Sequence, residues 1–168
     1  DPTALELRFD VAKQLASQSA SDGSTLERAL EHATVVFKAQ ADNLEVMSLL
    51  ADLHEKRGNA PEALRLLEKL SEREGSRSKR YLQYNRMLDL LGDSAGGQTQ
   101  ILDVASKAFF LQPSNRDAIT RLVLALENSG NEDQRAQHVL RYRQGVQANV
   151  LEGKLSHRDL KVLSLLLN

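Results

Sequence analysis

Apolar residues recur along the chain with the period of a helix, and the helices they predict end alike several times. The segment 49–59 carries apolar residues on one helical face and closes with Gly-Asn, after which Pro61 opens the next helix. The same helix end recurs at 84–93 and at 122–131. This recurrence predicts helix pairs, joined by short turns and repeated along the chain.

The second helices of these pairs repeat as well. Their aligned positions are Ala29, Ala33, Val36 and Ala41, then Ala63, Leu67, Leu70 and Gly75, then Ile101, Ala105, Ala108 and Pro113. The first offset, 29 to 63, is 34 residues, and the second, 63 to 101, is 38, because four residues at 94–97 lengthen one turn. A fourth copy follows around Ala136, Leu140, Arg143 and Ala148. The pattern therefore predicts four helix pairs with a basic period of 34 residues.

The alignment of these repeats predicts an all-α chain and the residues at which its helices begin and end. We expect helices at about 3–20, 24–40, 43–57, 60–74, 77–91, 98–111, 115–129, 132–148 and 157–168, with pairs over about 3–41, 42–75, 76–113 and 114–148 and a terminal helix over about 156–168. Three Ser residues have the capping-box spacing to an acidic residue, namely Ser24 with Glu27, Ser114 with Asp117 and Ser156 with Asp159. Asn59 and Asn131 stand where two of the second helices should be capped.

The pattern resembles the tetratricopeptide repeat (TPR) family. The resemblance is carried by the segment 101–113 as a second helix, and by Met47, Leu50, Ala51, His54, Ala63, Leu67 and Leu70 in pair two. It implies a single domain over 1–168, a right-handed α-solenoid of about four helix pairs plus a C-terminal helix. The chain departs from the family in lacking the first-helix Trp, and in placing Ala51, Asn85 or Val123 where the family has Gly. Asn85 puts the packing of pair three in doubt.

The two ends of the sequence indicate a piece of a longer array. Asp1-Pro2 resembles the last residues of a preceding repeat. The apolar terminal helix at 156–168 either caps the last pair or is the first helix of a further one, because such an apolar helix must cover something. We therefore expect contact with further repeats of a parent protein, which mass measurement of the natural product would test.

Composition excludes several classes of protein and leaves the compartment open. The formal net charge of −1 argues against a strongly basic nucleic-acid binder or a polybasic membrane anchor, and no apolar run is long enough to span a bilayer. The absence of Cys excludes disulfides, thiolate metal sites and cysteine nucleophiles, but it fits both the cytoplasm and the bacterial periplasm.

Catalytic chemistry finds little support in the sequence. The four His residues, His32, His54, His138 and His157, include no pair at the spacing of a helical zinc site, and phosphate loops and nucleophile elbows are missing. We expect no enzymatic activity, no cofactor and no metal. His54 is interpreted as a packing residue at the Tyr position of the repeat.

The strongest nucleic-acid candidate is a basic stretch with interleaved tyrosines, made of Arg73, Arg77, Lys79, Arg80 and Arg86 with Tyr81 and Tyr84. However, Tyr81, Tyr84, Leu88 and Leu91 follow the spacing of an inward helical stripe, which favours a core role. A second basic cluster, Arg135, His138, Arg141 and Arg143, is interpreted as a solvated face.

The resemblance implies that a concave groove, lined by the first helix of each pair, holds a peptide or a partner protein. The implied lining is Glu45, Ser48, Asp52 and Glu55, then Lys79, Leu82, Arg86 and Asp89, then Asp117, Thr120, Leu124 and Glu127. Ser48 and Asp52 disfavour a carboxylate clamp, because an acidic residue would repel a C-terminal carboxylate. We therefore expect a non-enzymatic protein-interaction scaffold. The alternatives are a periplasmic TPR segment of a polysaccharide-export or envelope machine, and an RNA-associated repeat module.

Overall fold

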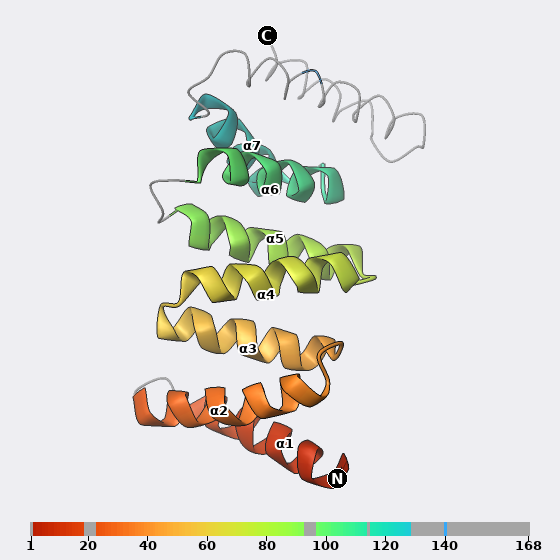
Figure 1. The fold of residues 1–168 in the computed structure, drawn as a ribbon. Helices are drawn as coiled ribbons and strands as arrows, with labels where there is room; N and C mark the ends of the chain where they lie inside the picture. The colour runs from red at the N-terminus through yellow and green to blue at the C-terminus, as the bar shows by residue number, and fades with distance from the viewer. Residues whose placement is uncertain (1, 19–22, 93–96, 114, 129–139, 141–168) are drawn as a thin grey trace. The chain divides into compact units, whose positions relative to one another are not determined.

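The computed structural model describes residues 2–18, 23–92, 97–113, 115–128 and 140, which form seven α-helices and no strand (Figure 1). The chain divides into two compact units, Asp1–Ser76 and Arg77–Asn168. The division falls between the second and third predicted pairs.

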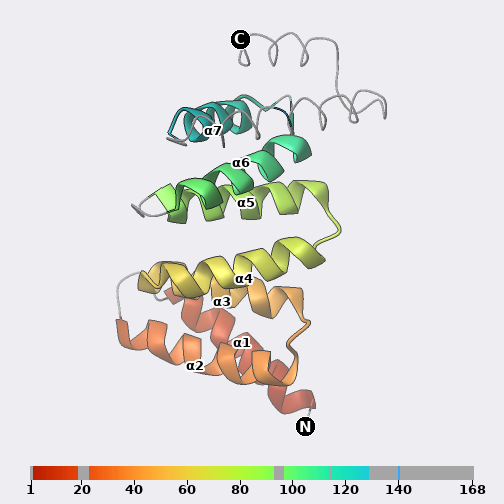
Figure 2. The same ribbon diagram turned by 45° about the horizontal axis from the view of Figure 1, so that its top comes forward.

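The first unit contains α1 (Pro2–Gln18), α2 (Gly23–Ala39), α3 (Leu44–Arg57) and α4 (Ala60–Arg73), and each helix packs against the next one in the chain (Figure 2). α1 also contacts α3. The core between them is built from small and branched side chains. Among its fully buried members are Ala29, Ala33, Val46, Met47, Leu53, Ala63 and Leu67.

The second unit contains α5 (Arg77–Gly92), α6 (Gln98–Leu111) and α7 (Arg116–Glu127), with α6 packed against both α5 and α7. The inward stripe predicted for α5 is confirmed, because Tyr81, Leu88 and Leu91 are buried and Tyr84 is half-buried. Tyr81 packs in one cluster with Ala108 of α6 and Ala118 of α7, and Tyr84 lies against this cluster.

Every described helix lies within two residues of its predicted bounds at both ends. The repeat alignment explains this agreement. The aligned residues inside the second helices are buried in all three copies apart from half-buried Ile101. Because burial selects apolar side chains at the same helical phase, the phase alone locates the helices. The predicted helices 132–148 and 157–168 lie outside the described residues except for Leu140.

The predicted turn between α3 and α4 is present. Gly58 caps α3 in the left-handed region, with φ of 76°. Its N–H donates to Glu55 O at 3.0 Å, and the N–H of Asn59 donates to His54 O at 2.9 Å. Only glycine adopts this backbone without strain, so the sequence Gly-Asn ends the helix for a physical reason.

The cap predicted at Ser114 is wrong, because the N-cap of α7 is the next residue, Asn115. Asn115 Oδ1 accepts from the N–H groups of Asp117 (2.9 Å) and Ala118 (3.3 Å). An Asn oxygen reaches the free N–H groups of the first turn as a Ser oxygen does.

The other predicted caps have mixed outcomes. Asn59 is the N-cap of α4, as predicted, but its side chain makes no capping hydrogen bond. α2 begins at Gly23, which places Ser24 inside the helix rather than at its cap. The caps at Asn131 and Ser156 lie outside the described residues.

Candidate functional site

The four predicted lining residues of pair two share one face of α3, which we call the α3 face. Glu45 is exposed, and Ser48, Asp52 and Glu55 are half-buried. The helix buries other positions instead, namely Val46, Met47, Leu50, Ala51 and Leu53. The predicted lining is thus the accessible side of this helix.

A side-chain cap sets where the α3 face begins. Asn43 Oδ1 accepts from the N–H groups of Glu45 (3.0 Å) and Val46 (3.3 Å), and Asn43 Nδ2 donates to Gln40 Oε1 at 3.0 Å. Arg73, at the end of α4, donates to Asp42 and to the carbonyl of Ala41 in the same loop. These contacts fix the loop that precedes the face.

In the second unit the predicted residues lie on α5 and α7, and we call them the α5/α7 face. Lys79, Leu82 and Asp89 of α5 are exposed, and Arg86 is half-buried. On α7, Asp117, Thr120 and Leu124 are exposed. Glu127 ends α7, and its side chain lies outside the described part. The α3 face and the α5/α7 face belong to different units.

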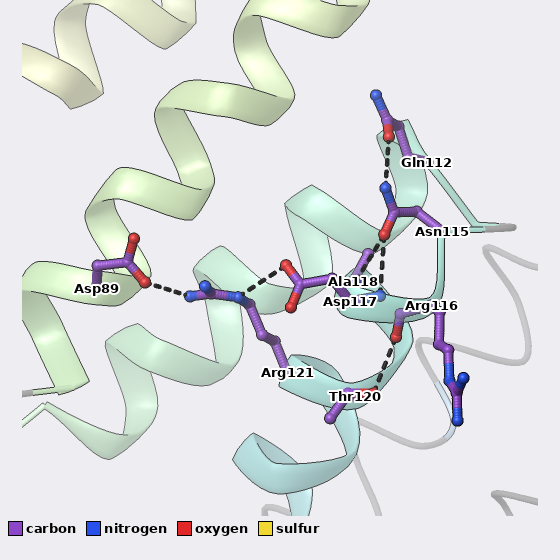
Figure 3. Close-up of polar contacts among 8 residues, drawn as sticks. All are labelled: Asp89, Gln112, Asn115, Arg116, Asp117, Ala118, Thr120 and Arg121. Atoms are coloured by element: carbon purple, nitrogen blue, oxygen red, sulfur yellow. Dashed lines mark hydrogen bonds and ion pairs between the residues drawn. The ribbon is translucent and has the colours of Figure 1, made fainter.

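Arg121 joins the two helices of the α5/α7 face, and the sequence prediction missed it. Its Nη1 donates to Asp89 Oδ1 of α5 at 2.7 Å, and its Nε donates to Asp117 Oδ2 of its own helix at 3.0 Å (Figure 3). Burial alone would lower the pKa of Arg121, but the two carboxylates outweigh it and raise the pKa. The spacing of Asp117 and Arg121, four residues apart, was a signal in the sequence for half of this arrangement.

Two leucines of this face expose large apolar surfaces. Leu82 is 60% exposed and Leu124 is 51% exposed, and both had been predicted to line the groove. Single exposed leucines are common on protein surfaces. Here the two leucines stand on α5 and α7, the helices that the Arg121 ion pairs connect. The face therefore combines apolar and charged groups.

The two tyrosines of the basic stretch pack in the core of the second unit. Tyr81 is buried and Tyr84 is half-buried against the same cluster, which agrees with the inward stripe predicted for these residues. Arg77 donates to the backbone carbonyls of Phe110 and Leu111 at the end of α6. The second basic cluster, 135–143, lies outside the described residues except for position 140.

Within the described ranges, three or more His, Asp or Glu side chains never gather as a metal site would require. The described helices include none that is both long and apolar enough to cross a membrane. In comparisons with known proteins, no family model matches the sequence and no curated protein is significantly similar to it.

Proposed function

We propose that this chain is a non-enzymatic protein-interaction scaffold, built as a right-handed α-solenoid of TPR-like helix pairs whose first helices bind a peptide or partner protein. The proposal rests on the accessibility of the predicted lining. Each described lining side chain on α3, α5 and α7 is exposed or half-buried, although these helices bury several of their other positions.

Polar contacts within the predicted pairs and between two of them support the proposal. Arg73 reaches Asp42 across 31 residues, Arg77 reaches Leu111 across 34, and Arg121 reaches Asp89 across 32. The first two contacts each join the two ends of one predicted pair, 42–75 and 76–113, whereas the third joins α7 of the fourth pair to α5 of the third. The contact of Arg121 with Asp89 is thus a tie between neighbouring pairs, the kind of interaction that stabilises stacked repeats.

The apolar part of the α5/α7 face offers the sharpest test. A displayed library of random peptides would first be selected for binding to the intact chain. The selected peptides would then be titrated against the wild type and against a Leu82→Ser, Leu124→Ser double variant. We expect the double variant to bind at least about tenfold more weakly, since apolar anchors in the centre of an interface contribute most of the binding free energy.

Leu7→Ser provides a matched control, because Leu7 is 66% exposed but lies on α1, outside both faces. It should leave the dissociation constant within about twofold of the wild-type value. A library that yields no specific peptide, or peptides that bind the double variant and the wild type equally, would contradict this site.

A further inference from the structure

His54, near the end of α3, stands in a polar cluster drawn from three helices of the first unit. We call it the His54 cluster, and it consists of Glu27, His54, Arg57, Asn59, Glu62 and Arg65. Asn59 Nδ2 lies 3.4 Å from His54 Nδ1. The charged groups acting on the ring are Glu62 and Arg65 of α4, Arg57 of α3 itself and Glu27 of α2. α1 reaches this end of α3 through a backbone atom, since Ala16 O accepts from Lys56 Nζ at 2.7 Å.

Both carboxylates of the cluster are already held by arginines. Arg57 Nε lies 3.1 Å from Glu27 Oε1, a contact that ties α3 to α2. Arg65 Nε donates to both carboxylate oxygens of Glu62, at 3.1 and 3.0 Å. A positive charge on His54 would therefore compete with Arg57 and Arg65 for their partners.

The contact with Asn59 also suits a neutral ring. Nδ1 accepts from the Asn59 amide only while that nitrogen carries no proton. If the side-chain amide of Asn59 flipped, its oxygen would accept a hydrogen bond from a protonated ring. That reversal would not restore the solvation that the half-buried imidazolium loses, nor remove the repulsion from the two arginines.

We propose that the His54 cluster is a proton-sensitive latch, which holds the α3–α4 turn and its tie to α2 while His54 is neutral and loosens when His54 is protonated. The amide groups of Gly58 and Asn59 form the hydrogen bonds of this turn. Loosening of the turn should therefore lower the protection of these two amides against hydrogen exchange.

The electrostatic balance gives the direction of the effect. Burial lowers the pKa of His54 below its ordinary value, and Arg57 and Arg65 lower it further, although Glu62 and Glu27 oppose them. The unfolded chain then binds a proton more readily than the folded one. The stabilisation is complete above the ordinary histidine pKa and is lost as the pH falls toward the lowered pKa.

The test follows the His54 ring and the turn amides of the intact chain by NMR between pH 8 and pH 5. As the ring takes up its proton, the protection factors of the Gly58 and Asn59 amides, corrected for intrinsic exchange, should fall about threefold. A ring that stays neutral throughout this range, or one that titrates without a change in protection, overturns the proposal.

Two substitutions at accessible positions should move the transition in opposite directions. Arg65→Gln releases Glu62 and removes a positive charge, so the midpoint should rise by about half a pH unit. Glu62→Gln removes the attracting carboxylate, so the midpoint should fall. Arg8→Gln on α1, whose side chain lies outside the cluster, should leave it unchanged. Midpoints that do not separate in this order would show that the cluster does not control the proton.

Discussion

Two asparagines begin their helices with the same contacts, 72 residues apart, since 115 − 43 = 72. Each side-chain oxygen accepts from two N–H groups of the first turn, and each Nδ2 donates 3.0 Å to a glutamine three residues earlier, Gln40 or Gln112. The repeated unit Gln-x-x-Asn thus joins a second helix to the following first helix. Because the two copies lie about two basic periods apart, they occupy equivalent positions of the repeat.

Removing either oxygen leaves N–H groups of the first turn without a side-chain partner. Asn43→Ala and Asn115→Ala should each lower the free energy of unfolding by about 1 kcal/mol, measured by urea denaturation with far-UV circular dichroism. Gln100→Ala is the control, because Gln100 is exposed in the first turn of α6, whose N-cap, Gly97, makes no side-chain capping bond. If all three substitutions had equal effects, the side-chain caps would not be the source of the stability.

At the scale of helices, the amphipathic period was enough to locate each described element, whereas tertiary contacts decided the rest. The periodicity reports which side chains are buried, so the stripe of Tyr81 and Leu88 could be predicted from sequence. The ion pair of Arg121 with Asp89 could not, because only the fold brings these two residues together. The choice of Asn115 over Ser114 as a cap depends on backbone geometry, which residue types alone leave open.

Asn85 marks a conflict between its residue type and its place on a helix. It occupies the repeat position that Ala51 occupies in α3, where the family has Gly. Asn85 is half-buried, and its Oδ1 is buried without a hydrogen-bond partner in the described part of the chain. An unsatisfied buried oxygen costs about 1–3 kcal/mol.

Asn85→Ala should therefore leave the free energy of unfolding unchanged or raise it by up to about 1 kcal/mol, because it removes this penalty and increases helix propensity. The reverse exchange, Ala51→Asn, should lower it by about 2 kcal/mol, because Ala51 is fully buried and an amide there would be desolvated. Thermal denaturation of both variants measures the two effects. A clear loss of stability in Asn85→Ala would mean that this side chain contributes packing that outweighs its unsatisfied oxygen.

At the scale of the whole molecule, the tyrosines allow the two units to be observed separately. The chain contains three tyrosines and no tryptophan, and Tyr81, Tyr84 and Tyr142 all follow residue 76. Near-ultraviolet tyrosine signals therefore report on the second unit, while the far-ultraviolet helix signal reports on both. A defect placed in the first unit can thus be followed into the second.

Leu67→Asp places a charge at a fully buried position of α4 and should destabilise the first unit by about 4 kcal/mol. Because α2 packs against α3 and α3 against α4, we expect the loss to spread to the first pair of helices. A continuous array further predicts that the thermal midpoint of the tyrosine signal falls as well, since each repeat is stabilised by its neighbours. Glu68→Asp, at an exposed position of the same helix, should leave both midpoints in place. A tyrosine midpoint unchanged in Leu67→Asp, beside a lost helix signal from the first unit, would show that the units unfold independently and would contradict the continuous array.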